Sequence, residues 1–161
     1  MVRGRTCIPA LRSPVERVMS VTFRNVSVSP REPVADWPFE ALAETLERGI
    51  INDWRPVLEE IRAHPWGRVA RRVEHWIELS SDDRAAVFFG LCVAEARERA
   101  ERAERAEVAR RVREAIDRSG LTAAEFAREV GTSASRLSTY ASGRVVPSAS
   151  MLLRIEHTAG P

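Results

Sequence analysis

Two short helical patterns, separated by a glycine, occupy residues 121–147, LTAAEFAREVGTSASRLSTYASGRVVP. In the first, Thr122 and Glu125 have the spacing of a capping box, in which each side chain bonds the backbone amide of the other residue. Gly131 ends this pattern, because glycine adopts the left-handed backbone that commonly closes a helix. The second pattern covers residues 133–142. The segment therefore predicts two short helices joined by a tight turn.

The second of these helices has an unusual composition. It is small and polar except for Leu137 and Tyr140, which lie on one side. Two short helices joined by a glycine turn are typical of a helix-turn-helix. A helix that enters the major groove of DNA needs short hydroxyl or Arg side chains facing outward, with apolar residues holding it to the preceding helix. The pattern predicts a domain that binds double-stranded DNA with helix 133–142.

Helical patterns also flank this pair. On the amino side an apolar stripe recurs every four residues, at Val108, Val112 and Ile116. On the carboxyl side Ser148 is a predicted N-cap of a last helix, whose apolar residues close the core. We expect a compact domain of four to five helices over residues 107–161.

The spacing of cap, glycine, apolar core and proline resembles the helix-turn-helix core of the Cro and phage-repressor type, the XRE-like family of bacterial regulators. The matching residues are Leu121-Thr122, Phe126-Ala127, Gly131, Ser133, Leu137-Ser138, Ser142-Gly143 and Pro147. Members of that family often carry Gln where this chain has Ala123 and Ala134. The chain thus lacks one usual phosphate contact and one usual base contact.

The resemblance implies which residues touch DNA. Base edges would be read by Ser135, Arg136, Ser138 and Thr139. Of these, only Arg136 can make a bidentate contact with guanine. Ser133 and Arg144 are the predicted phosphate contacts.

A long helix is predicted before this domain. From about residue 83 to residue 119 no proline interrupts the pattern, which gives a rod of roughly 55 Å. Its charged part, 83–106, carries Glu–Arg pairs four residues apart, at 95 and 99, 98 and 102, and 101 and 105. Small residues at 96, 100 and 103 form a thin stripe, so this part is either a solvated connecting helix or a seam between two subunits. The ten apolar residues 85–94 are too short to span a membrane and predict a buried helix segment.

Residues 36–82 form an acidic segment with all four tryptophans and three predicted short helices. The first is expected to be capped by Asp36 and to end at Gly49, and the second to start at Asn52 or Asp53. The tryptophans either fill a small core or form a surface for a partner. Residues 36–106 also resemble regions that precede such domains in actinobacterial regulators, through Trp37-Pro38 and 64–67, His-Pro-Trp-Gly.

Residues 1–35 are expected to be a flexible arm, and Met19 is a second candidate start. The arm lacks the continuous apolar stretch of a signal peptide, which indicates a cytoplasmic protein without a membrane partner. Cys7 and Cys92 are too few for a disulfide framework or a four-ligand zinc site.

Enzymatic functions are poorly supported. All 25 basic side chains besides histidine are Arg, so catalysis by Lys is excluded. The three histidines lack metal-ligand spacing, and no phosphate loop or nucleophile motif is present. We expect no catalytic residue, no metal and no cofactor.

Three functions remain. The first is a sequence-specific regulator, a repressor that acts as a homodimer on half-sites about 34 Å apart. The second is an antitoxin that represses its own operon through the same domain and neutralises a toxin with the tryptophan-rich segment. The third is an interaction adaptor built on the charged helix.

Overall fold

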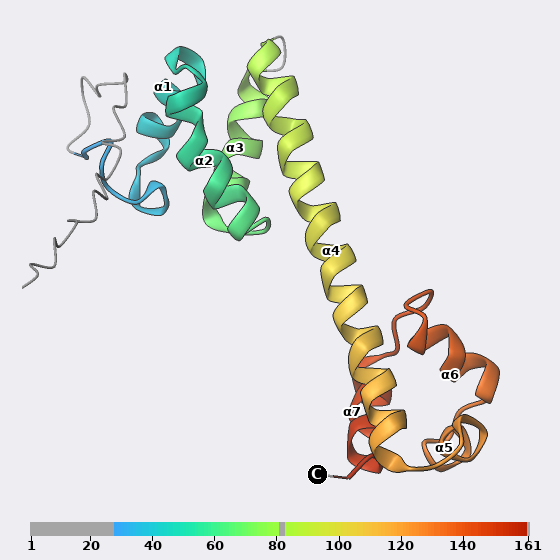
Figure 1. Ribbon diagram of the computed structural model, residues 1–161. Helices are drawn as coiled ribbons and strands as arrows, with labels where there is room; N and C mark the ends of the chain where they lie inside the picture. Colours follow the sequence, from blue (N-terminus) through green and yellow to red (C-terminus); the bar gives the residue numbers. More distant parts are fainter. Residues whose placement is uncertain (1–27, 81–82, 161) are drawn as a thin grey trace, which may run out of the picture.

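The computed structural model describes residues 28–80 and 83–160, and within these ranges the chain is all-α, as predicted. A long helix links a bundle at one end to a group of short helices at the other (Figure 1). The elements are a 3₁₀ helix, Val34–Asp36, and seven α-helices: α1 Phe39–Arg48, α2 Ile51–Ala63, α3 Arg68–Leu79, α4 Arg84–Ser119, α5 Ala123–Glu129, α6 Ala134–Ala141 and α7 Ala149–Thr158. None of the described helices is both long and apolar enough to cross a bilayer.

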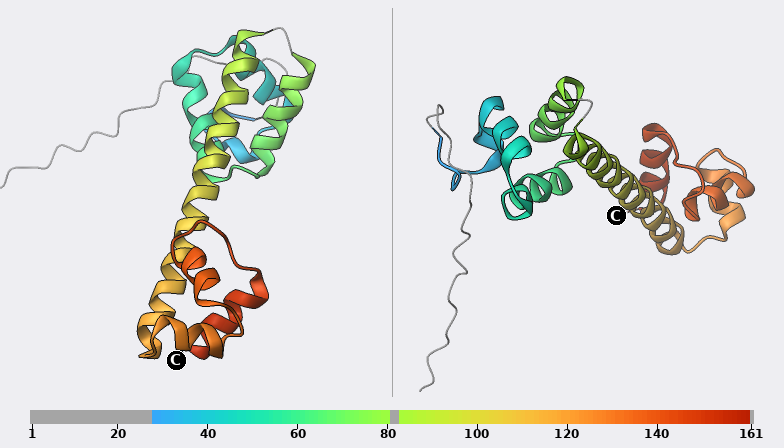
Figure 2. Two further views of the ribbon diagram at one scale, coloured as in Figure 1. Left: turned by 90° about the vertical axis from the view of Figure 1, so that its right-hand side faces the viewer. Right: turned by 90° about the horizontal axis from the view of Figure 1, so that it is seen from above.

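The N-terminal bundle consists of the 3₁₀ helix, α1, α2, α3 and the first turns of α4. Its core is closed by Ala86, Phe89 and Val93 from α4, all buried. The two views in Figure 2 show α4 leaving this bundle and continuing into the second group of helices. Besides connecting the two groups, the long helix is therefore a structural part of both.

Three of the four tryptophans pack in or against this core. Trp37 and Trp76 are fully buried, and Trp54 lies between α2 and α4 with its ring centroid 5.3 Å from that of Phe89. The Trp54 indole donates a hydrogen bond to the Thr45 carbonyl at 2.9 Å, which satisfies its polar end. Only Trp66 is exposed, in the turn before α3. Core packing thus accounts for the tryptophans that the described bundle contains, apart from Trp66.

The starts of the first two helices differ from expectation. Asp36 lies in the 3₁₀ helix and caps nothing, because α1 begins at Phe39 after Pro38. The second helix begins at Ile51, one residue before Asn52 and two before Asp53, the two predicted starts. The Asp53 carboxylate accepts a hydrogen bond from the Ile50 amide at 3.0 Å, so Asp53 supports the first turn from inside the helix.

Part of the expected arm belongs to the bundle. Val34 is buried in the core and Val28 packs against it, so residues 28–35 are structured. The remainder of the predicted arm, 1–27, and the candidate start at Met19 lie outside the described residues.

The segment 85–94 is only partly buried, contrary to the sequence-based expectation. Phe89 and Val93 face the core, whereas Val87, Phe88 and Leu91 are exposed. The reason is that α2 and α3 cover only one side of α4 here. Farther along, Arg97 binds both carboxylate oxygens of Glu74 at 2.6 and 2.8 Å, which raises the pKa of Arg97.

The middle of α4, residues 101–107, is exposed on all sides. The predicted pairs Glu95–Arg99 and Glu98–Arg102 form, at 2.5 and 2.6 Å. Among the described residues, Arg105 forms no ion pair with Glu101, in contrast to the prediction. Because Ala96 is buried in the bundle, the stripe of small residues is not continuous along the exposed helix.

Candidate nucleic-acid interface

A second apolar core holds the C-terminal helices together. Phe126 of α5, Leu137 of α6 and Ile155 of α7 are fully buried against Val112 and Ala115 of α4. Each short helix therefore contributes to a single shared core, which fixes the position of α6.

The start of α5 and the turn between α5 and α6 are built as the sequence predicted. The Thr122 amide donates to a Glu125 carboxylate oxygen at 2.9 Å, and the Glu125 amide donates to the Thr122 hydroxyl at 3.3 Å. The hydrogen bonds from the Thr122 hydroxyl and amide lower the pKa of Glu125, because they favour its charged form. Gly131, between α5 and α6, has φ of 75°, which only glycine adopts without strain.

Helix α6 is capped and turned as expected. The Ser133 hydroxyl accepts a hydrogen bond from the Arg136 amide at 3.2 Å, which caps the first turn. Leu137 and Tyr140 point into the core, and most of the remaining α6 side chains are exposed.

The predicted base contacts fall on the exposed side of α6. Ser135 and Ser138, three residues apart, share one helix face and are both exposed. Arg136 is exposed next to this face. Thr139 is half-buried, and its hydroxyl donates to the Arg136 carbonyl at 2.7 Å, which leaves it less available than the serines. Arg144 is exposed in the loop after α6.

The stretch of chain that contains α6 carries positive charge without acids. Residues 130–155 contain Arg136, Arg144 and Arg154 and no Asp or Glu. Within the described parts of the chain, neither Arg136 nor Arg144 forms an ion pair. Unpaired Arg side chains around a polar helix are what a phosphate backbone requires.

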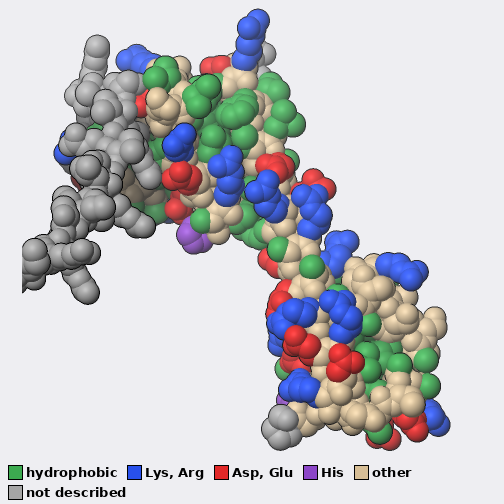
Figure 3. All heavy atoms as spheres, in the orientation of Figure 1, with side chains coloured by type: hydrophobic (Ala, Val, Ile, Leu, Met, Phe, Trp, Pro, Cys, Tyr) green, Lys and Arg blue, Asp and Glu red, His purple; other side chains and the backbone are tan. Residues whose placement is uncertain are grey.

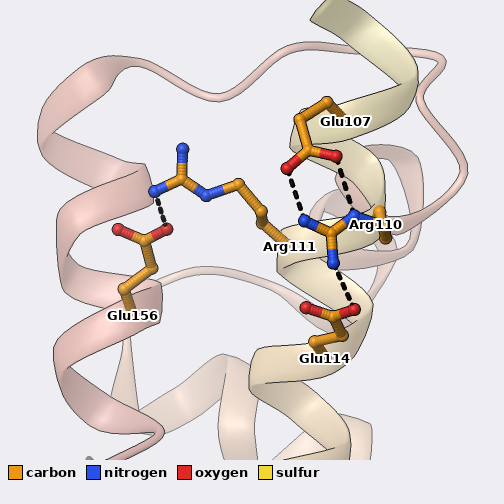
Figure 4. Close-up of polar contacts among 5 residues, drawn as sticks. All are labelled: Glu107, Arg110, Arg111, Glu114 and Glu156. Carbon is orange, nitrogen blue, oxygen red and sulfur yellow. Dashed lines mark hydrogen bonds and ion pairs between the residues drawn. The ribbon is translucent and has the colours of Figure 1, made fainter.

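The opposite arrangement is found between α4 and α7 (Figure 4). There Arg110 binds Glu107 and Glu114 of its own helix, and Arg111 of α4 binds Glu156 of α7. These carboxylates compensate the arginines, and their hydrogen bonds raise the pKa of Arg110. The charge distribution thus favours the α6 side as the DNA-binding face.

Sequence patterns alone missed the residues of α4 that contact the end of α6 and the loop after it. The Arg113 guanidinium donates to the carbonyl of Ala141, the last residue of α6, at 2.5 Å. A Cβ atom on Gly143 would lie 3.5 Å from Ala109 and 3.9 Å from the Arg105 side chain. The loop after α6 therefore lies directly on α4, with Arg105 beside it.

We expect the Arg113→Ala substitution to loosen the end of α6. Without the Arg113 side chain, the Ala141 carbonyl can accept a hydrogen bond only from water. The unfolding free energy of the domain should therefore fall by about 1 kcal/mol. Amide hydrogen exchange should show faster exchange in α6. Arg118→Ala is the matched control, because Arg118 is exposed on the same helix and makes no hydrogen bond to another described residue. Equal exchange rates in both variants would contradict the role of Arg113.

Comparison with known proteins identifies the C-terminal part. A helix-turn-helix family model matches residues 112–160, which are 49 of the 161 residues. No curated protein and no solved structure is significantly similar to the chain. The match begins inside α4 and includes α5, α6 and α7. Residues 112–160 are therefore a helix-turn-helix domain of the XRE type, and such a domain implies DNA binding.

Proposed function

We propose that this protein is a sequence-specific transcriptional regulator that represses by blocking access of RNA polymerase to a promoter. The observation that carries the proposal is the exposed polar face of α6, which has unpaired arginines beside it and no acid. In this proposal α6 enters the major groove, the position of the second helix in a helix-turn-helix. A cytoplasmic location and the relation to actinobacterial regulators belong to the same proposal.

The proposal also gives individual residues roles in DNA binding, which their positions in the domain support. In this proposal the exposed Ser135, Arg136 and Ser138 contact base edges. The half-buried Thr139 contacts a base edge from the side of α6. Ser133 and Arg144 bind phosphates at the two ends of α6. Arg105 is a further phosphate contact, because it lies beside Gly143 and has no acidic partner among the described residues.

Two serines at the start of α6, the N-cap Ser133 and Ser135, separate folding from recognition. Ser133→Ala removes the cap and should lower the unfolding free energy of the domain by about 1 kcal/mol. Ser135→Ala changes an exposed side chain and should leave stability within about 0.5 kcal/mol while weakening binding to the cognate site. Urea unfolding followed by circular dichroism gives the first quantity, and gel shifts give the second. If both variants lost the same stability, the assignment of Ser133 as a cap would be wrong.

Transcription in vitro tests the repressor function. Added to a template that carries its own upstream region, the protein should reduce transcript yield, and the effect should weaken as salt rises because phosphate contacts release counterions. An unchanged yield at every protein concentration, with DNA bound, would contradict repression. A rise in yield would identify an activator.

The alternative function is an antitoxin whose N-terminal bundle binds a toxin. An exposed tryptophan is a frequent anchor of such interfaces, and Trp66 is exposed at 45%. The other three tryptophans pack in the core of the bundle, so Trp66 is the one tryptophan that favours the antitoxin. A gene for a small toxin next to this one, and co-purification of its product with the bundle, would favour the antitoxin.

We also propose that the regulator acts as a homodimer, since one short recognition helix gives little affinity. We place the start of the DNA-binding domain at residue 107, inside α4, which continues through this position without interruption.

A further inference from the structure

The N-terminal bundle has an exposed apolar surface where α2 and α4 begin. Five large apolar side chains form this surface, which we call the α2–α4 surface. They are Ile50, Ile51, Val87, Phe88 and Leu91, and they are 56, 75, 63, 41 and 67% exposed. The Phe88 ring lies 5.7 Å from the ring of Trp54, which joins the two helices within the surface. Figure 3 shows hydrophobic side chains gathered at this end of the bundle, far from the helix-turn-helix domain.

The size of this surface lies at the upper end of what an isolated protein usually exposes, about 300–600 Å². With about 200 Å² for a fully accessible large apolar side chain, the five residues leave on the order of 600 Å² in contact with water. Two such surfaces brought together would bury about 1,200 Å², the lower limit of stable protein interfaces. The area is therefore sufficient for a dimer of this chain.

The charges on α4 make the surface complementary to itself. Arg84, Phe88, Leu91 and Glu95 follow one another at the 4-3-4 spacing of a coiled-coil seam, and all four are exposed. The apolar pair is thus preceded by a cation and followed by an anion. If two α4 helices cross antiparallel at residues 89–90, Arg84 of each faces Glu95 of the other, and Phe88 faces Leu91.

We propose that a second copy of this chain covers the α2–α4 surface, with the two α4 helices antiparallel. Within the described chain Arg84 has no ion pair, so the contact gives it an anionic partner. Glu95 forms an ion pair with Arg99 of its own helix at 2.5 Å, and both side chains are exposed. An exposed ion pair contributes little free energy, so Glu95 can also pair with Arg84 of the second copy.

This arrangement sets the distance between the two DNA-binding domains. The loop after α6 lies on α4 near Ala109, about 20 residues or roughly 30 Å from the crossing point. The two-fold axis doubles this distance to about 60 Å, closer to two turns of DNA than to the single turn of about 34 Å expected from the sequence. This part of the inference rests on the proposed function.

The oligomeric state of the full chain tests the contact. Light scattering after size exclusion should give twice the chain mass of 18.0 kDa for the unaltered protein. Leu91→Glu should give the single mass, because it places acids beside the centre of the two-fold contact. Leu153→Glu is the matched control, since Leu153 is 53% exposed on α7 in the other domain, and it should stay dimeric. A monomeric unaltered protein, or a dimer that only Leu153→Glu dissociates, would overturn the proposal.

A charge exchange tests the antiparallel arrangement. Arg84→Glu alone should weaken the dimer, because Glu would then face Glu95 of the other copy. The double variant Arg84→Glu with Glu95→Arg should restore it, since the opposite charges face each other again. Failure of the double variant to restore the dimer would exclude this arrangement.

DNA binding separates this inference from the proposed function. Monomeric Leu91→Glu protein should still bind a single half-site, with lower affinity for the full site. Loss of dimerisation with half-site binding retained supports both ideas. A dimer that binds no DNA sequence preferentially would leave the surface assigned and overturn the regulator.

Discussion

Replacing Phe126 by Ala should lower the unfolding free energy of the helix-turn-helix domain by about 3–5 kcal/mol, the usual cost of emptying a buried aromatic site. Phe126 is completely buried among side chains from α4, α6 and α7. A small domain has about 5–15 kcal/mol in total, so the loss is a large fraction of its stability. DNA binding should therefore be lost at a lower urea concentration than in the unaltered protein.

Two spectroscopic signals locate this effect. All four tryptophans lie in residues 37–76, so their fluorescence follows the N-terminal bundle only, whereas circular dichroism follows every helix. Phe126→Ala should move part of the dichroism transition to lower urea and leave the fluorescence transition in place. The control is Leu153→Ala, an exposed position that should change neither. An equal shift of both signals would mean that α4 joins the two cores into one cooperative unit.

Arg136→Ala should weaken binding to the cognate site by about 10- to 100-fold, the value of one bidentate contact with guanine. Binding to random duplex DNA should fall much less, because the other phosphate contacts remain. Fluorescence anisotropy at one fixed salt concentration measures both affinities.

The matched control for Arg136 is Arg48→Ala. It removes the same charge from an exposed position on α1, in the N-terminal bundle. The control should bind the cognate site as the unaltered protein does. Equal losses on cognate and random DNA for Arg136→Ala would show that Arg136 contacts phosphate and reads no base.

The sequence predicted the helix-turn-helix domain well because its signals are local. The capping box of Thr122 and Glu125, the cap at Ser133 and the turn at Gly131 each involve residues within a few positions of one another. Such signals depend on backbone geometry and are readable from one sequence.

Features that depend on contacts between distant residues were not predictable. The Arg113–Ala141 hydrogen bond joins residues 28 apart, and no local pattern marks Arg113 among the other arginines of α4. The exposure of Val87 and Leu91 was missed for the same reason. An apolar run predicts burial, but which side is covered depends on where α2 and α3 pack.

The central claim is that α6 reads a DNA sequence, and selection from a random pool of duplexes tests it most directly. The full chain, mixed with the pool at moderate salt, should enrich one motif, arranged as an inverted repeat with half-sites about two turns apart. Arg136→Ala should enrich a motif that is relaxed at one position, a guanine. A pool that remains random after several rounds, with all duplexes bound equally, would contradict the claim.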